Sequence, residues 1–122
     1  MQRALVLAIA LAAGFPASAE LRLLMVEQQG CAYCARWDAE IAPIYPLTPE
    51  GRAAPLERVQ VKGPYPEDVI LEHAPVFTPT FILVRNGQEV GRIEGYPGED
   101  FFWGLLARML AEAEDNTPKA AP

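Results

Sequence analysis

The chain has two cysteines, and they stand three positions apart, as Cys31 and Cys34, shortly after an unbroken apolar run. That run, from Leu21 to Glu27, is typical of a buried strand, and Gln28-Gln29-Gly30 provides a turn after it. The pair therefore begins a helix, with both sulfurs on its first turn. Unpaired N–H groups at a helix start stabilise a thiolate, which is the species that attacks disulfides. This arrangement predicts thiol–disulfide exchange.

A structural disulfide and a metal site are the alternatives for the two cysteines. A bridge over two residues closes a very small loop, so it constrains the unfolded chain little and adds little stability. Two soft thiolates suit Cu(I), whereas structural zinc requires four ligands and the chain offers no obvious cluster beyond the cysteines and His73. We predict no metal and no cofactor. A Cu(I)-binding thiol module and a redox-inert interaction protein remain as competing hypotheses.

Residues 1–19 have the pattern of a secretory signal peptide. Arg3 gives a basic start, residues 4–13 are apolar, and Ala17-Ser18-Ala19 supplies small residues for cleavage. This apolar run is too short to span a bilayer, which takes about 20 residues. An uncleaved N-terminal helix or anchor is the alternative to a cleaved signal peptide. We expect export, one domain over residues 20–114, and a disordered tail over 115–122.

The charge balance limits the partners. The chain carries 10 Lys and Arg against 16 Asp and Glu, a net charge of −6. An acidic surface disfavours nucleic acid and anionic membrane surfaces as partners. By itself this balance indicates only a soluble surface suited to a monomer.

Apolar periodicity and turn residues divide the rest of the chain into strands and helices. We predict a helix from the cysteines toward Pro43, a loop over 47–55, strands over 56–61, 80–85 and 88–94, a short helix over 67–73, and a last helix from Glu99. Asn86-Gly87 is a strong hairpin signal, and the helical crossover favours parallel pairing of the first two strands. The order is β-α-β-α-β-β-α, an α/β fold with a mixed four-stranded sheet flanked by helices.

This order, with Cys-x-x-Cys between the first strand and the first helix, resembles the thioredoxin fold. Thr78-Pro79-Thr80, immediately before the third strand, is similar to the Thr-Pro-Thr motif of thioredoxin-like proteins. The resemblance implies that Pro79 is a cis-proline beside the cysteines. It also implies that backbone groups of Thr78 pair with a substrate segment, much as an added strand would. An ordinary proline at a strand start is the alternative.

The order of the cysteines assigns their roles. We predict that Cys31, nearer the helix start and more exposed, attacks a substrate disulfide, and that Cys34, one turn deeper, resolves the mixed disulfide. Tyr33 either tunes the local field and the contact surface or is simply an exposed aromatic. The expected site therefore has Cys31 and Cys34 as catalytic residues, with Thr78, Pro79 and Tyr33 binding the substrate.

Two longer stretches, over residues 25–38 and 95–103, resemble the small exported thioredoxin-like proteins encoded with sulfur-oxidation systems, the SoxS type. This resemblance implies a periplasmic reductase of a partner protein's disulfide or modified cysteine, such as a sulfur carrier of thiosulfate oxidation. It also implies a membrane thiol donor that keeps the pair reduced. A disulfide oxidase or isomerase is the alternative.

The sequence also departs from thioredoxin itself. Gly30 replaces the Trp before the first cysteine, and Ala32-Tyr33 is similar in its Tyr to glutaredoxin and disulfide-isomerase motifs, which leaves glutathione dependence open. Met25 stands where thioredoxins carry a buried Asp that helps to move protons. Glu27 can substitute if its side chain turns inward, and a solvated strand end is the alternative.

Overall fold

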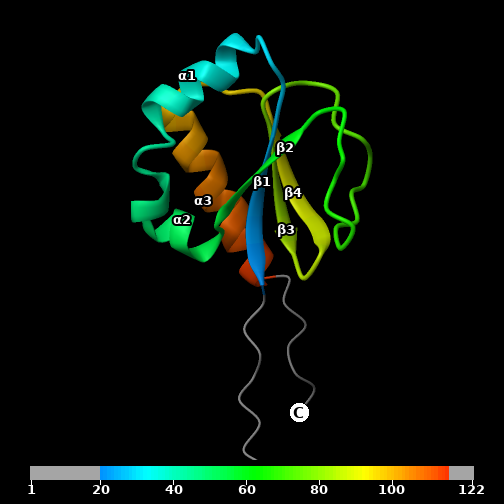
Figure 1. Cartoon of the computed structure of the whole chain (residues 1–122). Helices are drawn as coiled ribbons and strands as arrows, with labels where there is room; N and C mark the ends of the chain where they lie inside the picture. Colours follow the sequence, from blue (N-terminus) through cyan, green and yellow to red (C-terminus); the bar gives the residue numbers. More distant parts are fainter. Residues whose placement is uncertain (1–19, 116–122) are drawn as a thin grey trace, which may run out of the picture.

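The computed structural model describes residues 20–115 (Figure 1). In chain order the elements are β1 (Leu21–Glu27), α1 (Ala32–Glu40), the 3-10 helix η1 (Tyr45–Leu47), α2 (Pro49–Ala53), β2 (Leu56–Gln60), β3 (Thr80–Arg85), β4 (Gln88–Glu94) and α3 (Glu99–Asp115). The expected signal peptide and residues 116–122 of the expected tail lie outside this range, whereas Asp115 ends α3. Between residues 20 and 115, no helix has the length and apolarity needed to cross a membrane.

The four strands form one mixed sheet in the order β2-β1-β3-β4. β1 is parallel to β2 and antiparallel to β3, and β4 is antiparallel to β3. The central strands β1 and β3 are buried on both faces, which is why they are continuous apolar runs in the sequence. Asn86 and Gly87 both have positive φ, as a two-residue hairpin turn requires. The predicted fold class is confirmed.

The two faces of the sheet are covered by different means (Figure 1). α1 and α3 cover one face, where large aromatic side chains, among them Trp37, Phe81 and Phe102, are fully buried. The segment 61–79 covers the other face, where the buried side chains are aliphatic and the partly buried Tyr65 packs against them. Its buried residues are Leu24, Val26, Val59, Ile82 and Val84.

The predicted helix over 67–73 is wrong. The N–H of Ile70 donates to the carbonyl of Gly87 at 2.7 Å, and the N–H of Glu89 donates to the carbonyl of Ile70 at 3.1 Å. The backbone groups that a helix would pair internally are therefore paired with the start of β4. Arg22 of β1 also binds the Asp68 carboxylate at 2.7 Å, which fastens the same segment to the sheet.

The predicted loop over 47–55 is also wrong, because it contains α2. The hydroxyl of Thr48 accepts a hydrogen bond from the N–H of Gly51 at 3.0 Å, and Pro49 occupies the first helical turn. An N-cap threonine followed by proline is a typical helix start. Both helices between the first two strands thus precede β2, and the order is β-α-α-β-β-β-α.

Candidate active site

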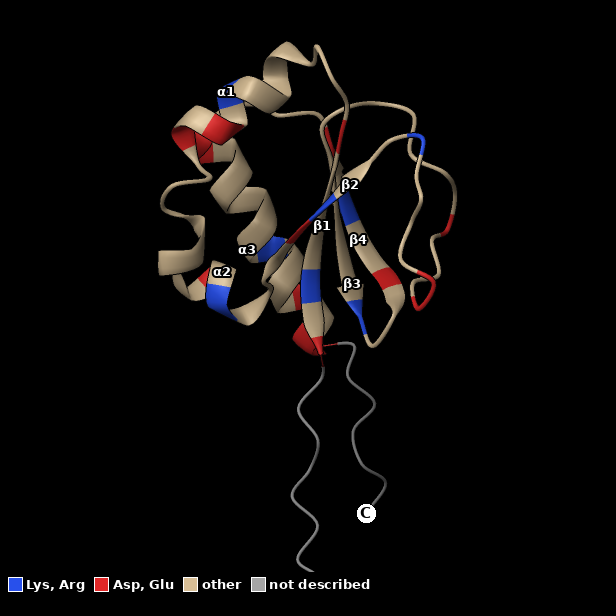
Figure 2. Ribbon diagram, viewed as in Figure 1, with Lys and Arg blue, Asp and Glu red and all other residues tan. Residues whose placement is uncertain are grey.

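Cys31 is the N-cap residue of α1. Gly30, at a φ of 78°, completes the turn from β1, and Cys31 has extended backbone angles before the helix begins at Ala32. The sulfur of Cys31 accepts a hydrogen bond from the N–H of Cys34 at 3.1 Å. The first turn of α1 carries no charged side chain (Figure 2). The positive end of the helix dipole therefore acts on the Cys31 sulfur without a neighbouring charge on that turn.

The two cysteines form a disulfide with an S–S distance of 2.17 Å and a Cα–Cα distance of 5.2 Å. Cys34 belongs to the buried core and is only 5% exposed, whereas Cys31 is half-buried. A partner that approaches from solvent can therefore reach Cys31 more easily than Cys34. These exposures agree with the order of roles predicted from the sequence, and the roles themselves stay a prediction.

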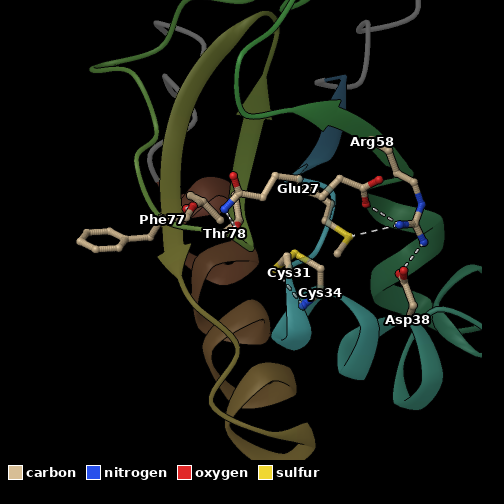
Figure 3. Close-up of a disulfide and its surroundings, with 10 residues drawn as sticks. Glu27, Cys31, Cys34, Asp38, Arg58, Phe77 and Thr78 are labelled. Carbon is tan, nitrogen blue, oxygen red and sulfur yellow. Dashed lines mark hydrogen bonds and ion pairs between the residues drawn. A yellow bond between two sulfur atoms is a disulfide. The ribbon is translucent and has the colours of Figure 1, made fainter.

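The pairing of β1 with β3 brings the Thr78-Pro79 segment to the cysteines. Val26 pairs with Thr80, so the residues just before β3 lie beside those just after β1. The side-chain amide of Gln28 donates to the hydroxyl of Thr78 at 2.9 Å, across 50 positions of sequence (Figure 3). The Thr78–Pro79 peptide bond is cis, as the resemblance implied.

Thr78 presents an unpaired backbone edge beside the disulfide. Pro79 is buried and its carbonyl accepts from the N–H of Gly95 at 2.7 Å, but within residues 20–115 no backbone group pairs with Thr78. Phe77, just before it, is exposed and its ring points away from the cysteines (Figure 3). Tyr33 is exposed as well, at the start of α1. Backbone pairing of this edge with an extended partner segment stays a prediction.

A cavity of about 340 Å³ opens beside the disulfide, between the end of β1 and the start of α1. Both cysteines line it, and so do the carboxylate-bearing residues Glu27 and Asp38. The cavity therefore brings solvent and two acidic side chains to the side of the buried Cys34.

The guanidinium of Arg58, from β2, joins the two carboxylates (Figure 3). It donates to Glu27 at 2.6 Å, to Asp38 at 2.7 Å and to the sulfur of Met25 at 3.6 Å. The hydrogen bond to Asp38 is the largest cause of the raised pKa of Arg58, so the group stays charged. Glu27 is thus directed to the cavity and held by a cation.

Arg58, Asp38 and Gln28 were not predicted as site residues. Arg58 lies beside Met25 because the parallel strands pair in that register. The sequence predicted the parallel pairing but contains no signal for its register, since both strands are short and β2 is only partly apolar. An arginine within a strand pattern was the one available signal.

Within residues 20–115, no group of three or more His, Cys, Asp or Glu side chains could hold a metal ion.

The family model of the thioredoxin-like domain matches residues 13–110, which is most of the chain. The chain belongs to the thioredoxin-like family. With its Cys-x-x-Cys disulfide, it is a thiol–disulfide oxidoreductase of that family. No sequence among curated proteins matches it.

Solved structures agree with this assignment. The chain is 63% identical to the periplasmic thioredoxin SoxS from Paracoccus pantotrophus in its reduced form, over 77% of this chain and 99% of that one, with a TM-score of 0.76. Thioredoxin from Fasciola hepatica is 21% identical, over 74% of this chain and 81% of that one, with a TM-score of 0.52. Malassezia sympodialis thioredoxin is 17% identical, over 74% and 75%, with a TM-score of 0.51. The last two show the fold alone.

Proposed function

We propose that this chain is an exported reductase that passes two electrons from the Cys31 and Cys34 thiols to a disulfide or a modified cysteine of a partner protein. The difference in exposure between the two sulfurs carries this proposal. A reachable sulfur at a helix N-cap is suited to attack, and a buried sulfur bonded to it is suited to resolve the product.

The reaction has two exchange steps. The Cys31 thiolate attacks one sulfur of the partner's disulfide, forms a mixed disulfide and releases the other sulfur as a thiolate, which takes a proton from water. Cys34 then loses its proton and attacks the Cys31 sulfur. The mixed disulfide breaks, the second partner thiolate leaves, and the Cys31–Cys34 disulfide holds the oxidised state. Thr78, Pro79 and Tyr33 bind the partner segment during both steps.

The setting of this reaction is proposed from the relative. The P. pantotrophus protein, at 63% identity, is described as periplasmic. We infer that residues 1–19 of this chain are a cleaved signal peptide and that the mature monomer works in the periplasm. The SoxS-type resemblance supports a sulfur-carrier protein as the partner and a membrane thiol donor as the source of electrons.

A trapping experiment tests the roles of the cysteines. Cys34→Ser leaves the mixed disulfide unresolved, so this variant accumulates covalent complexes with partner proteins. A thiol reductant should separate these complexes by reducing the mixed disulfide. Cys31→Ser is the matched control and accumulates none, because the attacking sulfur is gone. Equal amounts of complex with both variants, or none with Cys34→Ser, would contradict the assignment.

The reduction potential tests the direction of electron flow. We expect a value close to that of thioredoxin, about −270 mV. A value near the oxidant end, about −120 mV, would instead identify a protein that introduces disulfides.

A further inference from the structure

Two hydrogen bonds from outside β3 hold the edge formed by Thr78 and Pro79. The side-chain amide of Gln28, just after β1, donates to the hydroxyl of Thr78 at 2.9 Å. The carbonyl of Pro79 accepts from the N–H of Gly95 at 2.7 Å. Gly95 begins the turn over residues 95–98, which joins β4 to α3. The position of this turn therefore helps to set the position of the edge.

Tyr96, the second residue of this turn, binds the turn to α1. Its side chain is only 5% exposed and packs in the same buried cluster as Cys34. Its hydroxyl donates to the carboxylate of Glu40 at 2.6 Å. Glu40 is the last residue of α1, the helix that begins at the disulfide. Tyr96 thus joins the edge to the helix of the cysteines by a route that does not pass through the sheet.

The carboxylate that accepts this hydrogen bond is itself fixed. Arg36, one turn earlier on α1, donates to the other oxygen of Glu40 at 2.7 Å, and its guanidinium lies 5.9 Å from the centre of the Tyr96 ring. The hydrogen bond from Tyr96, and then the one from Arg36, lowers the pKa of Glu40, so this group is ionised at neutral pH. Hydrogen bonds to an ionised acceptor are about twice as strong as neutral ones. The contact between the turn and α1 therefore has a defined geometry.

We propose that Tyr96 is a positioning residue for the reaction with protein partners. Through Glu40, it fixes the Thr78 edge relative to the Cys31 sulfur. The proposal rests on the proposed function, in which Cys31 attacks a partner whose backbone pairs with Thr78. A displacement on the order of 1 Å can slow a positioned reaction about a hundredfold. A small disulfide has no backbone to place on the edge, so its reaction does not depend on Tyr96.

Two disulfides, one within a polypeptide and one without peptide groups, test this role. The reduced protein is mixed with oxidised insulin or with 5,5′-dithiobis(2-nitrobenzoate). Acid quenching, followed by alkylation of the remaining protein thiols and mass spectrometry, gives the second-order rate constant for each. We expect Tyr96→Phe to lower the rate constant with insulin about fivefold or more and to change the other by less than about twofold. An unchanged rate constant with insulin, or an equal fall in both, would overturn the proposal.

The reduction potential of the Cys31–Cys34 pair gives a second readout. It should keep its wild-type value in Tyr96→Phe, because the cysteines and the start of α1 are unaltered. A shifted potential would mean that Tyr96 acts on the sulfurs rather than on the edge, and it would contradict the positioning role.

Tyr45→Phe is the matched control. The hydroxyl of Tyr45 donates to the carbonyl of Ala54 at 2.6 Å in the same buried cluster, but it binds neither the turn over 95–98 nor the edge. This variant therefore loses a tyrosine hydrogen bond of the same length elsewhere in the core. Both rate constants should keep their wild-type values. If insulin reacts as slowly with Tyr45→Phe as with Tyr96→Phe, general loosening of the core is the cause and the proposal fails.

Variants of Glu40 test the same contact from its other side. Glu40→Ala removes the acceptor and should slow the reaction with insulin as much as Tyr96→Phe does. Glu40→Gln keeps an oxygen that can accept from Tyr96, so it should slow this reaction less. Combining Tyr96→Phe with Glu40→Ala should slow it no further than either change alone, because both break one contact. Losses that multiply in the double variant would overturn the link through Glu40.

The same measurements keep the two proposals separable. If the wild-type protein does not reduce insulin, or if Cys34→Ser does not trap insulin as a mixed disulfide, the proposed function fails and the role of Tyr96 fails with it. If both results are as expected while Tyr96→Phe reduces insulin at the wild-type rate, only the role of Tyr96 fails.

Discussion

On one face of the sheet, two helices bury interlocking aromatic rings, whereas on the other face a segment without helices covers five aliphatic residues. Trp37, Phe81 and Phe102 lie with ring centroids 4.9–5.8 Å apart, in tilted and edge-to-face arrangements. The loop-covered face has no comparable set of rings, and Arg22 and the bridge at Ile70 fasten its cover. Close packing of aromatic rings holds the helices on the first face, whereas an ion pair and backbone hydrogen bonds hold the loop on the other.

This difference has a functional side, because each face contributes one part of the site. The helix-covered face ends in the cysteines at the start of α1, and the loop-covered face ends in Thr78 and the cis-proline. The two parts of the site therefore meet at one end of β1. The aromatic core lies under the cysteines, and segment 61–79 leads to Thr78. Four predictions test this contrast.

Truncation in the aromatic cluster should have the largest effect. Phe102 is fully buried in contact with Phe81 and Trp37, so Phe102→Ala removes a large apolar side chain and leaves a cavity between two helices and the sheet. We expect a loss of about 3–5 kcal/mol in the free energy of unfolding, measured with urea on the oxidised protein. A loss below about 1 kcal/mol would show that this face is loosely packed.

Truncation on the opposite face should cost less. Ile82 is fully buried on β3 under segment 61–79. That segment has no helix to hold it, so it can relax into the space that Ile82→Ala leaves. The expected loss is about 2 kcal/mol, at the lower end of the range for such changes. The same urea titration measures it, and a loss equal to that of Phe102→Ala would remove the contrast between the faces.

Two glycines, Gly87 in the β3–β4 turn and Gly95 after β4, test the contact between this turn and the loop. Gly87 and Gly95 both have positive φ, but a Cβ on Gly87 would clash with the carbonyl oxygen of Asp68, whereas a Cβ on Gly95 has nothing within 4 Å. Each change to Ala costs about 1–2 kcal/mol from the backbone conformation alone. We expect Gly87→Ala to lose about 1 kcal/mol more than Gly95→Ala, since only it pushes the loop away. Equal losses would mean that the loop moves freely.

Acid should weaken an ionic contact on each side. The hydrogen bond from Tyr96, and then Arg36, lowers the pKa of Glu40 on α1, and the hydrogen bond from Arg22 lowers the pKa of Asp68 in the loop. Both carboxylates therefore add stability above their ordinary values of 4.5 and 3.8, and this stability is lost as the pH falls below them. The free energy of unfolding, measured at pH values from about 6 down to about 3, the range in which carboxylates begin to take up protons, should show this decline.

Two variants show how much of this loss of stability comes from Glu40 on α1 and how much from Asp68 in the loop. Tyr96→Phe removes the bond that lowers the pKa of Glu40 most, and Asp68→Asn removes the loop carboxylate, so each should flatten part of the acid decline. If neither variant changes the slope, other carboxylates cause the loss.

The elements that the sequence predicted well are those whose cause is local. The strands β1, β3 and β4 and the start of α3 follow from apolar runs, the Asn86-Gly87 turn and acidic residues at a helix start. The segment 67–73 was predicted wrongly because its backbone partners, Gly87 and Glu89, come from a distant hairpin. Local periodicity has no information about such partners.

The same distinction holds in the site. The cysteine pair and Thr78-Pro79 are short motifs, and both were found. Arg58 was missed because its contacts depend on the register of β2 against β1. They also require that Asp38 of α1 reaches the same guanidinium group. Three elements must be placed in space before that cluster exists, so no window of sequence contains it.

The hydrogen bond from Gln28 to Thr78 spans 50 positions, whereas the cysteines are three apart. A chain that has not yet paired β1 with β3 can already join its two sulfurs, because closing so short a loop needs no tertiary structure. It has no edge beside them on which to hold a partner until β3 arrives. During folding, the two sulfurs can therefore meet before the Thr78 edge that lies beside them in the folded protein has formed.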